Sequence, residues 1–201
     1  MLSQEQDTPA AEPPPPAARG VVNLYSLEYY ELVRRRLAPG GAFAQWLPVK
    51  QLPPYEALTL IRAFVDAFPH AALVSGESSE LILLGSDRPL KLSLPRLLAR
   101  TRRPAVAKDL RSVGIRDGFD LLATLTLDDA ALRRRTRDVE PCSGKDPAIE
   151  YADLSELNLE FSVALSRRQG DPATLISRWG DTPAEERERG GRRERGGKTM
   201  R

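Results

Sequence analysis

A helical period of apolar residues marks the part of the chain around which the rest is organised. Its apolar positions, spaced close to i, i+3, i+4 and i+7, are Leu27, Tyr30, Leu32, Val33 and Leu37. This spacing predicts an amphipathic helix. Ser26 precedes it as a candidate N-cap and Glu28 lies in its first turn, while the arginines at 34–36 lie in its last turn, where the helix dipole favours cations.

A turn and a strand follow this helix directly. Pro39-Gly40-Gly41 should end the helix, because proline cannot continue it and glycine suits the turn. The segment Ala42–Leu47 is short, mostly apolar and bounded by turn residues, which predicts a buried strand. Helix, turn and buried strand form the αβ half of a βαβ unit, so the sequence predicts an α/β fold.

A second helix and a hairpin extend the expected sheet. Apolar residues at helical spacing between Pro53 and Phe68 predict the helix, and Pro54 suits its first turn. Two short apolar runs, Ala71–Val74 and Leu81–Leu84, are separated by a short polar loop. They predict an antiparallel hairpin.

The chain changes character on both sides of this region. Residues 1–20 include a run of prolines from Pro13 to Pro16, which indicates an extended linker. Residues 91–180 predict a helical appendage, because short helical patterns are separated there by Pro, Gly or Asp. The patterns are Ser93–Arg102, Pro104–Val113, Phe119–Leu125, Asp128–Arg137 and Leu154–Leu165. Residues 181–201 have almost no apolar side chain, so we expect a disordered charged tail.

Composition and charge narrow the class of protein. The 201 residues have 41% hydrophobic content and a formal net charge of +2, which suits a globular body and gives no general case for nucleic-acid binding. The apolar runs are too short to span a bilayer and no signal peptide is visible, so we expect no membrane partner. One cysteine, Cys142, allows no disulfide within this sequence and favours a cytoplasmic setting.

Two single residues and one pair could take part in chemistry, but each has a simpler structural interpretation. His70 stands alone, without an acidic, Ser or Cys partner at a recognisable spacing, and Cys142 has no base near it in sequence. Asp128-Asp129 fits the start of a helix better than a metal pair. We therefore expect no metal site.

Several motifs, in their order and spacing, resemble one known family. They are Leu24-Tyr25, Glu28-Tyr29-Tyr30-Glu31-Leu32, Leu37-Ala38-Pro39-Gly40-Gly41, Gln45-Trp46-Leu47, Phe68-Pro69-His70 and Gly85-Ser86-Asp87-Arg88-Pro89. Together they resemble the C-terminal half of spermidine synthases (polyamine aminopropyltransferases) and their bacterial relatives, which have the class I S-adenosylmethionine-dependent methyltransferase fold. The resemblance covers the chain from Glu12 to Tyr151. It implies a partial Rossmann-like methyltransferase sheet with an antiparallel final hairpin, in which Leu81–Leu84 lies between the other two strands.

The resemblance also implies candidate site residues. In the family, an acidic, proline-containing segment leaves strand 4, covers the active site and supplies an Asp that accepts the proton of the amine substrate. Glu12 stands at that place, so Glu12 is the candidate catalytic residue, and its segment is either such a lid or a plain linker. Tyr25, Gln45 and Trp46 are candidates for substrate binding. The alternatives are packing at the helix start for Tyr25 and a half-buried core cap for Trp46.

The chain departs from the family in several places. A Glu replaces the key Asp, and the loop at 75–79 lacks the aromatic residue that the family uses near its amine substrate. Ser143-Gly144-Lys145-Asp146-Pro147 stands where the relatives often have Thr-Asp-Asp-Arg-Pro, before Glu150-Tyr151. No Gly-x-Gly turn and no ribose-binding acid precede the match. We therefore expect the chain alone to bind neither S-adenosylmethionine nor its decarboxylated form.

Three functions stay open on these grounds. The chain is an S-adenosylmethionine-type transferase acting on a small amine, a non-catalytic fragment or interaction module, or a half-enzyme completed by a partner chain. In each case we expect residues 21–90 to be the C-terminal half of the domain. We also expect the edge of Ala42–Leu47 to be open, with Phe43 and Trp46 partly uncovered. An open edge favours a homo-oligomer or pairing with a complementary N-terminal half.

Overall fold

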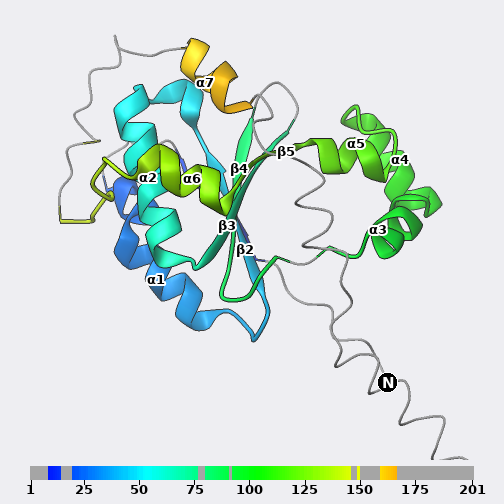
Figure 1. Cartoon of the computed structure of the whole chain (residues 1–201), viewed down its shortest axis with the longest axis horizontal. Coiled ribbons are helices and arrows are strands. Elements are labelled where there is room, and N and C mark those ends of the chain that lie inside the picture. The colour runs from blue at the N-terminus through cyan, green and yellow to red at the C-terminus, as the bar shows by residue number, and fades with distance from the viewer. Residues whose placement is uncertain are drawn as a thin grey trace, which may run out of the picture.

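A five-stranded open sheet runs through the part of the chain that the computed structural model describes, namely residues 9–14, 20–76, 80–90, 92–145, 149 and 159–166. The strand order is β1-β2-β4-β3-β5 (Figure 1). The strands are β1 (Ala10–Ala11), β2 (Ala42–Leu47), β3 (His70–Ser75), β4 (Leu81–Ser86) and β5 (Leu125–Asp128). The expected α/β class is confirmed.

The pairing of the three central strands is also as expected. β4 lies between β2 and β3 and is antiparallel to both, with Ala44 opposite Leu84 on one side and Ala72 opposite Leu84 on the other. β1 is parallel to β2, and β5 is antiparallel to β3. The sheet is therefore mixed, with its single parallel pair at the β1 edge.

Helices cover the two faces of this sheet unequally. The α-helices are α1 (Leu27–Arg36), α2 (Pro54–Ala67), α3 (Leu94–Thr101), α4 (Pro104–Ser112), α5 (Gly118–Ala123), α6 (Asp129–Thr136) and α7 (Leu159–Ser166). Two short 3₁₀ helices, η1 (Val21–Tyr25) and η2 (Val49–Gln51), precede α1 and α2. Figure 1 shows α1, α2, α6 and α7 over one face, whereas α3, α4 and α5 lie on the other side and stand away from these helices.

The signals that the sequence places at the helix ends operate as expected. The Ser26 hydroxyl accepts a hydrogen bond from the Tyr29 backbone N–H at 3.3 Å, which caps α1. Gly40 has a φ of 77°, in the left-handed region that glycine adopts without strain, and it turns the chain from α1 into β2. α2 begins at Pro54, whose missing N–H costs nothing in a first turn.

The stretch after residue 90 contributes to the sheet as well as to an appendage. The prediction of a helix over Phe119–Leu125 is wrong at its C-terminal end, because α5 stops at Ala123 and Leu125 begins β5. A bulge in the pairing with β3 places Leu125 and Leu127 in different apolar clusters, and the Thr126 hydroxyl donates to the Leu73 carbonyl. Such a short, bulged strand has no clear period-two pattern in the sequence.

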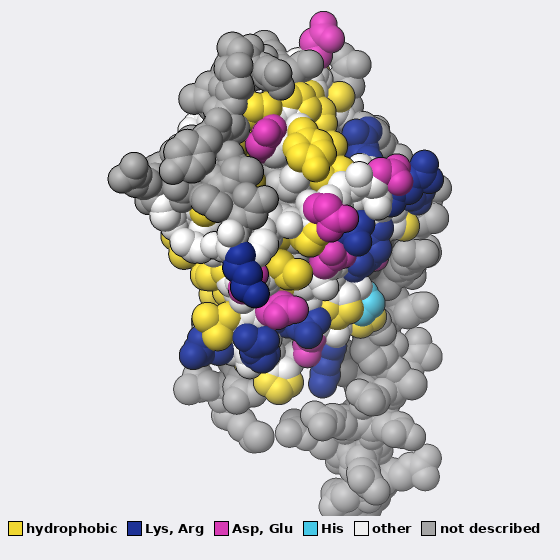
Figure 2. All heavy atoms as spheres, turned by 90° about the vertical axis from the view of Figure 1, so that its left-hand side faces the viewer, with side chains coloured by type: hydrophobic (Ala, Val, Ile, Leu, Met, Phe, Trp, Pro, Cys, Tyr) yellow, Lys and Arg dark blue, Asp and Glu magenta, His cyan; other side chains and the backbone are white. Residues whose placement is uncertain are grey.

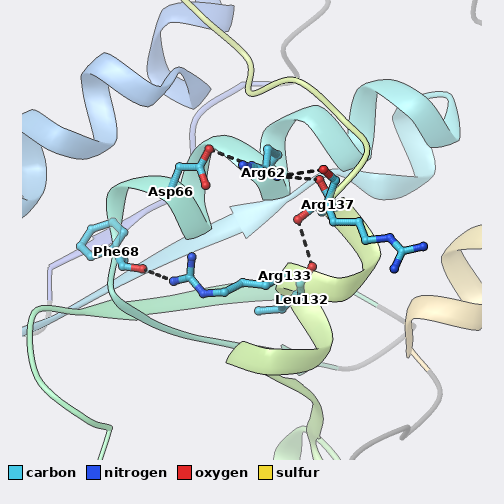
Figure 3. Close-up of polar contacts among 7 residues, drawn as sticks. Arg62, Asp66, Phe68, Leu132, Arg133 and Arg137 are labelled. Atoms are coloured by element: carbon cyan, nitrogen blue, oxygen red, sulfur yellow. Dashed lines mark hydrogen bonds and ion pairs between the residues drawn. The ribbon is translucent and has the colours of Figure 1, made fainter.

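Arginines join α6 to α2 at both helix ends. The Arg133 guanidinium of α6 donates to the Phe68 carbonyl at 2.9 Å, next to the C-terminus of α2. The Arg62 guanidinium of α2 donates in turn to the carbonyls of Thr136 and Arg137, at the C-terminus of α6 (Figure 3). Each helix thus supplies cations for the carbonyl groups that the other helix leaves unpaired. The division of the chain at residue 90 stays a prediction, but α6 is attached to the sheet domain.

An aromatic layer separates α1 and α2 from the sheet. It consists of Tyr29, Tyr30, Phe43, Phe64 and Phe68, with ring centroids 4.8–6.4 Å apart. Gly85 of β4 lies directly beneath it: a Cβ atom there would be 2.6 Å from Cγ of Phe68 and 2.8 Å from Cε1 of Phe64. The rings therefore occupy the space that any other residue at position 85 needs.

Two expectations about the sheet edge need correction. Phe43 is 3% exposed, because its side chain points into the aromatic layer rather than toward the edge. The edge of β2 is partly paired, since β1 runs beside it and the Ala44 N–H donates to the Pro9 carbonyl at 3.0 Å. Proline lacks a donor but keeps its acceptor, so a proline-rich segment can still form a short parallel pair. The tail from 181 and most of the helix expected from Leu154 lie outside the described residues, although its end is α7.

The contact beneath the aromatic layer predicts the effect of one added methyl group. Gly85→Ala should lower the free energy of unfolding by about 1–3 kcal/mol, because the core is already filled. Gly76→Ala is the control, since its nearest neighbour would be an ordinary 3.6 Å away. Denaturant unfolding of the two variants measures the difference, and equal stability would show that the rings do not fix this position.

The arginine contacts predict a difference between neighbouring residues of α6. Arg133→Gln should destabilise the protein by about 1 kcal/mol, because the Phe68 carbonyl loses its charged donor. Arg134→Gln removes the same charge from an exposed position and should change stability far less. Thermal unfolding of both variants tests this, and an equal loss would assign the effect to net charge.

Candidate functional site

The carboxyl ends of β1 and β2 lie side by side and bring two of the candidate residues near each other. Ala11 of β1 is the register partner of Gln45 of β2. Glu12 follows Ala11 at once and is exposed, whereas Pro13 is buried. In open α/β sheets this end of parallel strands is where ligands bind. The proline-containing segment therefore runs next to the expected site from its first residue.

Tyr25 holds this segment in place from below. Its side chain is fully buried, and its hydroxyl donates to the carbonyls of Pro13 and Pro14, at 3.2 and 3.3 Å respectively. Burial, and secondly the negative charge of Glu12, raise the pKa of the Tyr25 phenol, which keeps it protonated as a donor. Tyr25 is thus an anchor for the segment that carries Glu12, a role that sequence reasoning did not identify.

Gln45 and Trp46 lie on opposite faces of the sheet, as neighbours in a strand must. Gln45 is completely buried on the face that carries Phe43, whereas Trp46 is half-buried on the other face. The Gln45 amide nitrogen has a long contact of 3.5 Å to the Trp46 carbonyl. Its side-chain oxygen has no hydrogen-bond donor among the described residues. The structure does not bring these two side chains into one pocket.

A carboxylate that the sequence did not single out holds the Trp46 indole. Nε1 of Trp46 donates to Oε2 of Glu80 at 2.8 Å, and the Lys50 ammonium lies 3.0 Å from Oε1 of the same carboxylate. The hydrogen bond from Trp46, and then the one from Lys50, lower the pKa of Glu80. These contacts tie the end of β2 to the start of β4.

The carboxylate of Glu28 binds the segment after α6, a contact that the sequence did not indicate. Both oxygens of Glu28 accept hydrogen bonds, one from the Ser143 hydroxyl at 2.8 Å and one from the Gly144 N–H at 3.1 Å. Its own backbone N–H, and then Gly144 and Ser143, hold the pKa of Glu28 at about 2. The Leu27 N–H donates to the Cys142 carbonyl at 2.9 Å. This segment therefore supports the start of α1, next to Tyr25.

Of the other candidates for chemistry, Asp128 has a structural role. The Asp128 side chain caps α6 by accepting from the Ala131 N–H, as expected for a helix start. His70 is the half-buried first residue of β3, and Cys142 is buried. In the described part of the chain no group of His, Cys, Asp and Glu could hold a metal ion. The helices that are described include none that could cross a membrane.

A shallow, open hollow of about 490 Å³ lies elsewhere, between the end of β3 and the α4–α5 turn. Its polar lining includes Arg116 and Asp120, which form a bidentate ion pair at 2.6 and 2.9 Å. Arg116 is largely exposed and Asp120 is fully engaged by it. Glu12, Tyr25, Gln45 and Trp46 do not line this hollow, so it is separate from the candidate site.

The residues at the candidate site do not fit an S-adenosylmethionine-type ligand. Such a ligand needs a glycine turn that lets the backbone approach it closely. The glycines with positive φ in the described chain are Gly20, Gly40 and Gly114, which lie before η1, before β2 and after α4. The residues that follow β1 and β2 are instead Glu12 and Pro48. No described residue therefore supplies such a glycine turn at this edge of the sheet.

Comparisons with known proteins find similarity among solved structures only. No family model matches the chain, and no curated protein matches it. Among solved structures, a probable spermidine synthase from Corynebacterium glutamicum ATCC 13032 aligns with a TM-score of 0.40 and 16% sequence identity. The alignment covers 69% of this chain and 50% of that chain, so the present chain spans half the length of that protein.

The anchor formed by Tyr25 predicts a local effect of losing one hydroxyl. Tyr25→Phe should free the segment after β1 at a cost of about 1 kcal/mol, or roughly a factor of five in the opening equilibrium. Hydrogen exchange at the Ala44 N–H, which pairs with Pro9, should become faster. Tyr55→Phe, at an exposed position, is the control. Unchanged exchange at Ala44 would show that β1 does not depend on Tyr25.

Proposed function

We propose that residues 9–90 form the C-terminal half of a spermidine-synthase-like transferase domain and carry the amine-binding side of its site. The family named in this proposal comes from the resemblance of the sequence motifs. The structure supports the proposal with the order β2-β4-β3, the antiparallel β4 between its neighbours, and a parallel strand that leads into Glu12 and the prolines. By the same resemblance the full reaction uses S-adenosylmethionine or its decarboxylated form, which the described residues do not fit.

The observation that carries this proposal is the unpaired oxygen of Gln45. A buried acceptor without a donor costs about 1–3 kcal/mol. This oxygen lies at the carboxyl end of β2, in the position where the resemblance expects substrate binding. A protonated amine has several N–H donors and would satisfy it. Because Gln45 is fully buried, the amine would reach it only after the structure around this side chain opens.

Glu12 is suited to the proton transfer that the family requires of its Asp. It lies one residue beyond the Ala11–Gln45 pair, and it is exposed to solvent. A carboxylate beside the ammonium group of a substrate both attracts the cation and accepts its proton. Tyr25 positions this carboxylate through the carbonyls of Pro13 and Pro14. We therefore assign Glu12 as acid–base residue and Tyr25 as positioning residue.

Titration with a short diamine tests the amine site directly. 1,4-Diaminobutane should shift the side-chain amide resonance of Gln45, and Gln45→Met should weaken binding at least about tenfold, the effect of losing one hydrogen bond to a charged group. Gln51→Met, at an exposed position, is the matched control. The proposal is wrong if Gln45 does not respond, or if 1,4-butanediol, which carries no charge, produces the same shift.

A half-enzyme completed by a partner chain is the second candidate, and one observation favours it. The helices α1, α2, α6 and α7 lie over a single face of the sheet (Figure 1). On the opposite face the side chains of Trp46, Ile82 and Leu84 are only half-buried. A complementary N-terminal half would cover this face and supply the nucleoside site. A second copy of the chain could cover it as well, which would give a homo-oligomer.

A further inference from the structure

The net charge of the chain conceals a strongly basic pair of helices. The nineteen residues from Leu94 to Ser112, which contain α3 and α4, include six cations and one anion, a formal charge of +5. The whole chain carries +2, so the other residues together carry −3. We expected no nucleic-acid partner because positive and negative charges nearly balance over the whole chain. That balance is an average over a basic helix pair and an acidic remainder.

Five of these cations have no ion-pair partner within the residues that the structure describes. All five are exposed, and they are Arg100, Arg102, Arg103, Lys108 and Arg111. The face formed by α1, α2 and α6 differs, because its basic and acidic side chains are interspersed (Figure 2). There Arg62 pairs with Asp66 and Arg133 with Asp129. Cations without a described ion-pair partner, such as Arg36 and Arg134, also occur elsewhere, but α3, α4 and their two-residue turn hold five of them within twelve residues.

We propose that α3, α4 and the Arg102-Arg103 turn bind the phosphate backbone of duplex nucleic acid without reading its sequence. Four of the five cations are arginines, whose planar fork suits phosphate oxygens. α4 has nine residues and is about 14 Å long, which matches about four phosphates along one strand of a duplex. The helices stand away from the helix-covered face of the sheet, so a rod-like partner can approach them (Figure 1).

Two other anionic partners fit this surface less well. A membrane surface needs a free apolar helix face beneath the cations. The apolar side of α3 offers little such surface, since Leu97 and Leu98 are half-buried and pack at Gly118 of α5 so closely that a Cβ there would be 2.9 Å from Leu98. Single-stranded nucleic acid is usually held by stacking on aromatic rings, and the sequence from Arg100 to Arg111 contains none.

Fluorescence anisotropy with a labelled DNA duplex of about 20 base pairs tests the proposal on the full chain. Five phosphate contacts predict that log K falls with log salt with a slope of about −4 to −5 between roughly 50 and 200 mM salt. The variant Arg100→Gln, Arg102→Gln, Arg103→Gln should reduce the slope to about −2 and weaken binding about a hundredfold or more at the lowest salt.

A matched variant separates this surface from charge in general. Arg35→Gln, Arg36→Gln, Arg134→Gln removes three exposed cations from α1 and α6 and should bind the duplex as the unaltered chain does, apart from a small long-range effect. The proposal is wrong if the unaltered chain does not bind the duplex at the lowest salt, if both variants lose affinity equally, or if only vesicles of anionic lipid or single strands are bound. Circular dichroism of both variants verifies that they are folded.

Discussion

The close approach of Phe64 and Phe68 to Gly85 fixes how α2 lies on the sheet, and the rest of the described structure follows from that contact. The two rings leave no room for a side chain on β4 at this point. Tyr30 and Phe43 pack against the same rings and so place α1 and β2. The carbonyl of Phe68 then receives Arg133, which attaches α6. Burial of apolar surface, the aromatic rings included, stabilises this arrangement, and the Arg133 contact attaches α6 to it.

The aromatic layer also determines the geometry of the candidate site. α1 and η1 hold Tyr25 beneath the sheet edge, and Tyr25 holds the backbone that carries Glu12. Glu28 reinforces the start of α1 from the opposite side through Ser143. A chain of ordinary hydrogen bonds therefore connects the core to an exposed carboxylate. Trp46 belongs to a different environment on the other face, where Glu80 fixes its indole, so a structural role suits Trp46 better than Gln45.

The sequence predicts well those elements whose signals are local. Ser26, Pro54 and the turn at Gly40 mark helix ends by their own backbone chemistry, and the three longer strands are apolar runs between turns. β1 and β5 could not be predicted in this way. Ala10–Ala11 becomes a strand only because β2 lies beside it, and Thr126 interrupts the alternation of β5 with a bulge.

The same reason explains which parts of the site were foreseeable. The motif resemblance indicated Glu12, Tyr25, Gln45 and Trp46 as residues of interest, but it could not show that Gln45 and Trp46 lie on opposite faces. Glu80 is 34 residues from Trp46 in sequence, and Ser143 is 115 residues from Glu28. Contacts of that range leave no periodicity or spacing in the sequence, so only the folded arrangement reveals them.

Calorimetric titration of the chain with decarboxylated S-adenosylmethionine tests the central claim most directly. The claim is that these residues provide the amine side of a spermidine-synthase-like site and not the nucleoside side. We expect no measurable binding of the nucleoside by the chain alone, because no described glycine turn follows β1 or β2. Binding at micromolar concentration by the chain alone would contradict the account, because it would require a nucleoside site formed by residues other than those described.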